Sequence, residues 1–178
     1  NARLFDETTR LLKETEQRTA ELAVINSVQE GLAKELDMQG IYELVGDRLC
    51  EIFPDTQTLV IRPFDHEAGT EQFHYAIEKG ERFPIDERSF TWTSKELIET
   101  KKPLDIRENY IETAKNHGGT GVTKGQPPKS AVFVPMLAGE VVKGSISLQN
   151  VDKENAFTDT DLRLLTTITN IMSVALEI

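Results

Sequence analysis

Three polar residues at alternate positions, Ser145, Ser147 and Gln149, have the spacing that most clearly favours binding chemistry. They alternate with Ile146 and Leu148, and successive side chains of a β-strand point to opposite faces of a sheet. The pattern therefore predicts a strand with one apolar face and one face that can hydrogen-bond. Hydroxyl and amide groups gathered on one face can orient a polar small molecule.

Arg62, His74 and Trp92 would add a cation, an imidazole and a stacking ring. Arg62 and His74 lie in two predicted strands, residues 56–65 and 71–79, joined by a link of hairpin composition. Each side chain could face the polar side of the sheet or be solvated at the surface, and the sequence leaves both open. Trp92 stands among hydroxyl groups and could form a stacking wall for a ligand or simply fill core space.

The sequence contains no motif typical of a catalytic or metal-binding site. Paired cysteines, His-x-x-x-His spacing, a nucleophile elbow and kinase or cyclase catalytic motifs are all missing. The single cysteine, Cys50, has no basic residue at catalytic spacing, which favours a small buried thiol over a reactive one. We therefore predict a non-catalytic chain without a metal site or a bound cofactor.

A hairpin followed by a helix must position the polar strand. Residues 131–137 and 141–150 are rich in β-formers and are joined by a Gly-containing turn at residues 138–140. The next helix begins at Thr158, whose hydroxyl can cap free amides, and Asp161 places negative charge in the first turn. The apolar residues of this helix form two stripes, so we expect the second stripe to meet another partner, such as a second copy of the chain.

A long helix is predicted for residues 1–36, which contain no proline and are rich in good helix formers. Read in sevens, it carries an interrupted apolar seam at Leu4, Leu11, Arg18, Ile25 and Leu32. The seam favours a dimeric coiled coil, and the alternative is a linker helix that packs on its own domain. A second helix is predicted for residues 37–53, capped by Asp37 or Gln39.

The C-terminal half of the chain resembles GAF domains. The resemblance rests on V-P-M at residues 134–136, the run GSISLQN at residues 144–150, then Phe157, Asp161 and a Leu-rich helix. It extends over nearly the whole chain, which looks like the tandem GAF modules of bacterial signalling proteins. It implies an α+β fold of three layers, with an antiparallel sheet between the N-terminal, second and closing helices and a ligand pocket under short helices and loops. The implied units are a signalling linker helix at residues 1–36 and a GAF domain at residues 37–178.

The resemblance also implies where a small molecule would bind. The candidate ligand-binding residues are Arg62, Phe64, His74, Trp92, Thr93, Val132, Val134, Ser145, Ser147 and Gln149. Residues 108–128 hold four glycines and would form a mobile lid or a disordered surface loop. The lid and the polar strand face favour a sensor. The lack of an evident charged anion-binding cluster favours the alternative, a relay domain whose pocket is empty or filled by side chains.

Cyclic-nucleotide-binding GAF domains carry an Asn-Lys…Phe-x-x-x-Asp-Glu signature, which this chain matches only in part. The matching residues are Asn150, Lys153, Phe157 and Asp161, with Leu162 in place of the glutamate. We interpret the four as structural and predict that a Lys153–Asp161 ion pair holds the closing helix on the sheet above Phe157. Cyclic nucleotide binding is kept as a minor alternative.

The composition of the chain argues against several further classes of protein. A net charge of −10 argues against binding nucleic acid or anionic lipid, and no apolar run has the length of a membrane span. One cysteine excludes an internal disulfide, and it does not match the several cysteines of the free methionine sulfoxide reductases, an enzyme group with the GAF fold. We expect a cytoplasmic sensory module of a histidine kinase or nucleotide cyclase, homodimeric through its terminal helices, with a small molecule as its other partner.

Overall fold

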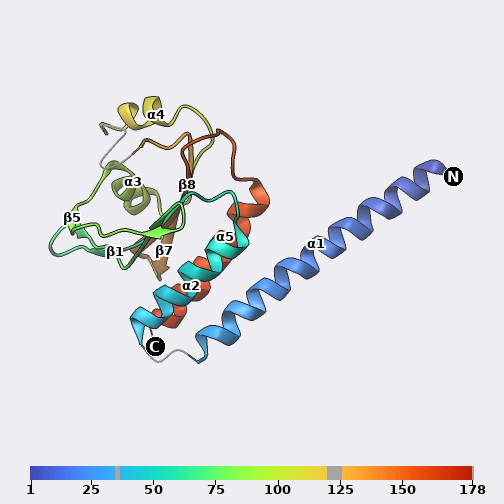
Figure 1. Ribbon diagram of the computed structural model, residues 1–178, viewed down its shortest axis with the longest axis horizontal. Coiled ribbons are helices and arrows are strands. Elements are labelled where there is room, and N and C mark those ends of the chain that lie inside the picture. Colours follow the sequence, from blue (N-terminus) through green and yellow to red (C-terminus); the bar gives the residue numbers. More distant parts are fainter. Residues whose placement is uncertain (35–36, 120–125, 178) are drawn as a thin grey trace.

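The computed structural model describes residues 1–34, 37–119 and 126–177 of the chain. Within these ranges five helices surround one sheet (Figure 1). The helices are α1 (Ala2–Leu32), α2 (Met38–Ile52), α3 (Trp92–Thr100), α4 (Tyr110–Asn116) and α5 (Asp159–Leu176). The strands are β1 (Thr58–Asp65), β2 (Thr70–Glu71), β3 (Tyr75–Glu78), β4 (Glu81–Arg82), β5 (Arg88–Ser89), β6 (Leu104–Ile106), β7 (Ser130–Ala138) and β8 (Val141–Asn150).

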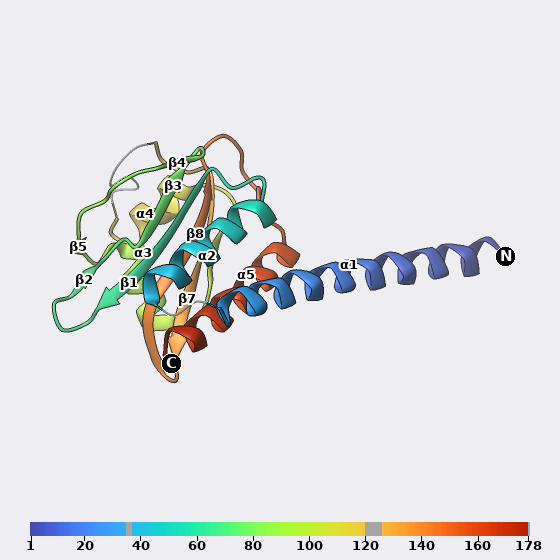
Figure 2. The same ribbon diagram turned by 60° about the horizontal axis from the view of Figure 1, so that its bottom comes forward.

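The sheet is antiparallel and lies between two helical layers. Its strand order is β4-β3-β1-β8-β7-β6, and β2 pairs with β1 and β5 beside this path. Helices α2 and α5 cover one face, whereas α3 and α4 lie on the other (Figures 1 and 2). The predicted three-layer α+β fold is therefore confirmed, as is the central β7–β8 hairpin with its turn at Gly139.

The face covered by α2 and α5 carries the larger core. Leu59 of β1 and Leu148 of β8 are fully buried there against apolar residues of both helices. Val132 and Val134 of β7 belong to this same core, because they alternate with Ala131 and Phe133, which pack under α3. The prediction that the two valines line a pocket is therefore wrong, since they face the helical layer.

Helix α5 begins as its sequence predicts. Thr158 is the N-cap, its Oγ1 accepts a hydrogen bond from the Asp161 amide at 3.1 Å, and the Asp161 carboxylate accepts one from the Thr158 amide at 2.9 Å. This reciprocal capping box satisfies amides that the first turn would leave free. Phe157, just before the cap, is buried in the core and fixes how the chain enters the helix.

The long helix α1 has two environments. Its C-terminal part packs on the domain, where Val28 and Leu32 are buried and Arg163 of α5 pairs with Glu21 at 3.0 Å. Its N-terminal part extends away from the body (Figure 2), and Leu4 and Leu11 are exposed there. The predicted seam is thus divided between a part that packs on its own domain and a part left open to solvent. In the portion of the chain that the structure describes, no helix has the length and apolar character needed to cross a membrane.

The predicted strand at residues 71–79 is interrupted. The structure has β2 up to Glu71 and β3 from Tyr75, with residues 72–74 outside both strands. The break shifts the alternation, so Phe73 lies over the Arg62 and Arg88 guanidinium groups while Tyr75 enters the core beneath α2. An unbroken strand would place Phe73 and Tyr75 on one face, so the prediction of a continuous strand at residues 71–79 is wrong.

Candidate functional site

A buried arginine anchors the polar face of the sheet. Arg62 of β1 is 5% exposed, and its Nη1 donates a 2.7 Å hydrogen bond to Ser147 Oγ on the adjacent strand β8. The strand register places Arg62 directly opposite Ser145, which is also buried, and paired residues share a face. Three predicted site residues, Arg62, Ser145 and Ser147, therefore lie together on the face away from α2 and α5.

Glu71 completes a charged cluster at this place and was not anticipated. Its side chain is fully buried, with Oε2 3.5 Å from Arg62 Nε and 3.3 Å from Arg88 Nη2. Its other oxygen, Oε1, accepts hydrogen bonds from the Thr91 amide at 3.0 Å and the Ser94 hydroxyl at 2.8 Å. One carboxylate thus joins β1, β2, β5 and the start of α3. The expectation that this face lacks a charged cluster is corrected.

Burial dominates the electrostatics of the cluster. It lowers the pKa of Arg62 to about 10, an effect that Glu71 opposes and Arg88 reinforces. Arg62 still carries its charge at neutral pH. Among the groups that the structure describes, none accepts a hydrogen bond from Arg62 Nε, although the Glu71 carboxylate lies close enough for an ion pair.

Aromatic rings surround the two arginines. The Arg88 guanidinium carbon lies 4.8 Å from the centre of the Phe73 ring, and that of Arg62 lies 5.7 Å from the Phe133 ring. These are cation–π distances. Burial raises the pKa of the Tyr110 hydroxyl on α4, and the positive charges of Arg62 and Arg88 oppose this rise. The cluster is therefore cationic with largely apolar walls.

Trp92 and Thr93 stand at the edge of this region, at the start of α3. The Trp92 ring lies 6.0 Å from Tyr110 and 5.1 Å from His117 of the α4 end. It lines a cavity of about 250 Å³. Thr93 is buried and its hydroxyl lies 3.0 Å from that of Thr91. Trp92 therefore packs partly on the core and partly lines this cavity, and its role as a stacking wall for a ligand stays a prediction.

The other two polar candidates, Gln149 and His74, lie away from the arginine cluster. Gln149 is half-buried and shares the face of Ser147, but it pairs with Thr58 at the far end of the sheet. His74 lies on the opposite side, where its ring centre is 5.0 Å from that of Tyr42 of α2 and burial lowers its pKa. The strand break at residues 72–74 explains this. The prediction that His74 faces the pocket is wrong.

Phe64 lies beyond the cluster at the end of β1. It makes edge contacts with Phe90 at 5.2 Å and His66 at 6.2 Å between ring centres. It also lines a cavity of about 270 Å³ together with Met38 and Tyr42 of α2. Phe64 pairs with Glu71 in the sheet, but its ring contacts are with Phe90 and His66. Of the predicted lid at residues 108–128, residues 110–116 form α4 and residues 120–125 lie outside the described residues.

The four residues of the partial nucleotide motif hold the connection between β8 and α5. Asn150 Oδ1 accepts hydrogen bonds from the Asp152 and Lys153 amides, both at 2.9 Å, and Asn150 Nδ2 donates to the Asp55 carbonyl at 2.8 Å. Lys153 pairs with Asp55 at 3.0 Å, so the predicted ion pair with Asp161 is wrong. Asp161 is committed to the capping box. The structural interpretation agrees with these contacts, with a different partner for the lysine.

Cys50 is remote from the arginine cluster. It lies on α2, on the other side of the sheet, with Sγ 3.9 Å from the Tyr75 hydroxyl. Burial is the main reason that the pKa of its thiol is raised, which keeps the thiol protonated at neutral pH. These surroundings match the small, half-buried thiol predicted from the sequence.

The fold is shared with several proteins of known structure. The chain resembles the GAF domain of a phosphoenolpyruvate-protein phosphotransferase from Acinetobacter, with 10% identity, a TM-score of 0.67 and coverage of 89% of this chain and 93% of that one. It resembles residues 122 to 287 of a methyl-accepting chemotaxis protein, with 13% identity, a TM-score of 0.71 and coverage of 84% and 94%. It also resembles the free methionine-R-sulfoxide reductase of Neisseria meningitidis, solved with its substrate, with 14% identity, a TM-score of 0.70 and coverage of 88% of both chains.

Sequence comparison assigns the family. No curated protein matches the chain. The family model described as GAF domain matches residues 35–177, which is most of the chain and includes every strand and α2 to α5. The chain therefore belongs to the GAF domain family.

Proposed function

We propose that this GAF domain is a non-catalytic, cytoplasmic sensory module of a bacterial signalling protein. A small molecule binds on the polar sheet face at Arg62, Ser145 and Ser147, beside the start of α3. Its binding biases the packing of α1 and α5, and these helices join two copies of the chain and relay the state. A histidine kinase or a nucleotide cyclase would suit as the rest of the parent protein.

The observation that supports this proposal is the cluster of buried Arg62 and Glu71 with half-buried Arg88. Buried charges cost free energy unless they are paired, and a chain that needed only a packed core would place apolar side chains here. The cluster joins four elements, so a ligand that altered its contacts would act on β1, β2, β5 and α3 together. A ligand shifts an equilibrium only by binding one arrangement more tightly, and this connected cluster gives it a means to do so.

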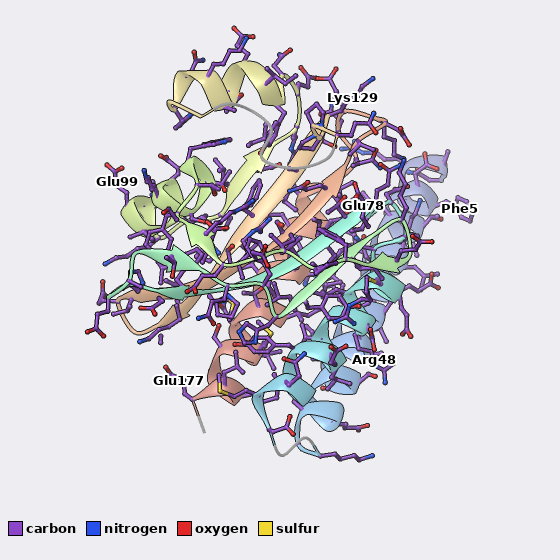
Figure 3. The ribbon with its side chains drawn as sticks, turned by 60° about the vertical axis from the view of Figure 1, so that its left-hand side comes forward. Phe5, Arg48, Glu78, Glu99, Lys129 and Glu177 are labelled. Carbon is purple, nitrogen blue, oxygen red and sulfur yellow. The ribbon has the colours of Figure 1, made fainter. Side chains whose placement is uncertain are left out.

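Trp92, the single tryptophan of the chain, gives a direct test. We would titrate the purified chain with a metabolite library and follow tryptophan fluorescence, in the native chain and in Arg62→Gln. Arg48→Gln is the matched control, because Arg48 is a partly exposed arginine on α2, on the far side of the sheet from α3 (Figure 3). A saturable change present in the native chain and the control, but absent in Arg62→Gln, supports the proposal. Changes that are identical in all three chains would count against this face as the site.

The relay without a ligand is the second candidate. It is favoured by the contacts that the polar face already makes within itself, since Glu71 binds both arginines and the start of α3. Cyclic nucleotide binding draws less support, because Asn150 and Lys153 are occupied by contacts with Asp55. Catalysis of the methionine sulfoxide type draws none from Cys50, which lies on the opposite side of the sheet.

A further inference from the structure

The buried donor Arg62 Nε indicates the class of ligand that would bind at this site, an inference that rests on the proposed function. Arg62 is nine-tenths or more buried and Nη1 is committed to Ser147, while Nε lacks a hydrogen-bond acceptor among the described residues. An arginine remains protonated at neutral pH, and a hydrogen bond to a charged group is worth more than one between neutral groups. An acceptor that carries negative charge would therefore satisfy this position best.

The net charge of the cluster also favours a negatively charged ligand. The Arg62, Glu71 and Arg88 side chains carry two positive charges and one negative charge, a formal sum of +1. The single carboxylate is also shared, because Oε1 of Glu71 is bound by the Thr91 amide and the Ser94 hydroxyl. Only Oε2 faces the guanidinium groups. One further negative charge would bring the three side chains and their ligand to neutrality.

The side chains around Arg62 limit the size and charge of the rest of the ligand. Phe73 and Phe133 lie against the guanidinium groups, and Ser147 is the nearest hydroxyl. Apolar and aromatic walls suit a compact organic body, whereas a multiply charged molecule would leave unpaired charge in a buried place. Arginine presents its donors in a planar fork that matches the oxygens of a carboxylate or phosphate group.

We propose that Arg62 binds a small organic molecule through one singly charged oxyanion group, a carboxylate or a phosphodiester, with Glu71 as a resident competitor for the same guanidinium. Glu71 holds Arg62 in place when the site is empty and weakens the ligand's hold when the site is occupied. The affinity for the anion therefore depends on how strongly Glu71 and the oxyanion group of the ligand compete for Arg62.

Nitrogen-15 NMR of the arginine Nε–H groups tests this directly on the full chain. The probes are acetate and benzoate as carboxylates, cyclic AMP as a phosphodiester, and inorganic phosphate as an ion of higher charge, with sodium chloride holding the ionic strength constant. Acetamide and benzamide are the neutral matches. Arg62→Lys identifies the Arg62 signal by removing it. We expect that signal to move saturably with benzoate or cyclic AMP and not with the neutral amides.

Variants separate this site from general salt effects. Glu71→Gln keeps an acceptor at Oε1 for Thr91 and Ser94 but removes the competing charge, so we expect it to bind the same anion about tenfold more tightly, the size of one charge-assisted hydrogen bond. Arg62→Lys should weaken binding by a similar factor, and Arg48→Gln should bind as the native chain does.

Three results would overturn the inference: equal shifts with acids and amides, an Arg62 signal that no anion moves, or a Glu71→Gln chain that binds the anion no better. Its failure can be told from failure of the proposed function. A neutral metabolite that binds, and whose binding Arg62→Gln abolishes in the fluorescence titration, would keep the sensor and exclude the anion. A chain that binds neither acids nor neutral compounds would remove both.

Discussion

At the scale of single residues, the two carboxylate oxygens of Glu71 bind different partners. Oε2 faces the guanidinium groups of Arg62 and Arg88, and Oε1 receives the Thr91 amide and the Ser94 hydroxyl. A fully buried carboxylate is stable only with such partners. Glu71 therefore acts as the electrostatic link between the sheet and the start of α3.

Replacing this carboxylate tests the link. Glu71→Ala leaves two guanidinium groups without it and frees the Thr91 amide, so we expect the free energy of unfolding to fall by about 3–5 kcal/mol. Urea denaturation measures the loss. Glu71→Gln should lose less because it keeps one acceptor, and exposed Glu81→Ala is the control. A loss in Glu71→Ala no larger than that of the control would show that the cluster contributes no stability.

His74 should make the fold less stable in acid. Burial lowers the pKa of His74 in the folded chain below its ordinary value of 6.5. The unfolded chain then takes up the proton more readily, so this residue makes stability fall as the pH drops through about 6.5. His74→Gln should therefore lose less of its melting temperature between pH 7 and pH 5 than the native chain loses. His117→Gln, on the other side of the sheet, is the control, and equal losses in native and His74→Gln chains would contradict the assignment.

The sequence allowed part of this site to be predicted. Alternation along β8 placed Ser145 and Ser147 on the face of Arg62, because β8 is regular from Gly144 onward and pairs on both sides there. The same logic failed for His74, since the chain leaves the sheet between β2 and β3. Glu71 could have been found from the hairpin, because its pairing with Phe64 puts it on the face of Arg62. A lone glutamate at the start of a strand is ordinarily solvated, which concealed it.

At the scale of elements, the entry into α5 decides how the closing helix is fixed. The contacts that fix it are local: the capping box of Thr158 and Asp161 and the Asn150 turn before it. The predicted ion pair between Lys153 and Asp161 is wrong because Lys153 pairs with Asp55, which lies between α2 and β1. Sequence spacing does not reveal that the fold brings these two residues together. Capping patterns are read within four residues, whereas ion pairs between distant segments depend on the complete fold.

A double-mutant cycle measures the capping box. Thr158→Ala should lower the free energy of unfolding by about 1 kcal/mol, the usual value of an N-cap. Asp161→Ala should have a similar effect, and the double variant should lose less than the sum because both remove one reciprocal pair. Lys153→Met, which removes an exposed ion pair, should change stability by less than about 1 kcal/mol. Strict additivity of the two capping variants would argue against a reciprocal box.

At the scale of the whole molecule, α1 has one part that packs on the domain and one part that projects from it. Its C-terminal part is fixed by Val28 and Leu32 in the core, while Leu4 and Leu11 remain exposed on the part that extends away. Exposed apolar residues in register on a projecting helix favour pairing with a second copy. A change in α5 would reach this helix through their shared contacts, of which Arg163–Glu21 is one.

Sedimentation equilibrium tests the pairing without cutting the chain. The native protein should be a dimer at micromolar concentration, and Leu4→Gln/Leu11→Gln should shift it toward monomer, because both substitutions remove apolar area from the seam. Glu7→Gln/Glu16→Gln is the control on the same stretch of helix. A native chain that stays monomeric at high micromolar concentration would contradict the dimer.

We expect a small molecule to bind on the polar sheet face at Arg62, and a thermal-shift panel with a metabolite library measures this binding. A ligand at about a hundred times its dissociation constant should stabilise the fold by roughly 2.7 kcal/mol, which raises the melting temperature by several degrees in a domain of this size. We predict such a shift in the native chain and in Arg48→Gln, and its loss in Arg62→Gln. A flat panel, together with a native mass that shows no bound ligand, or a shift that Arg62→Gln retains, would contradict the account.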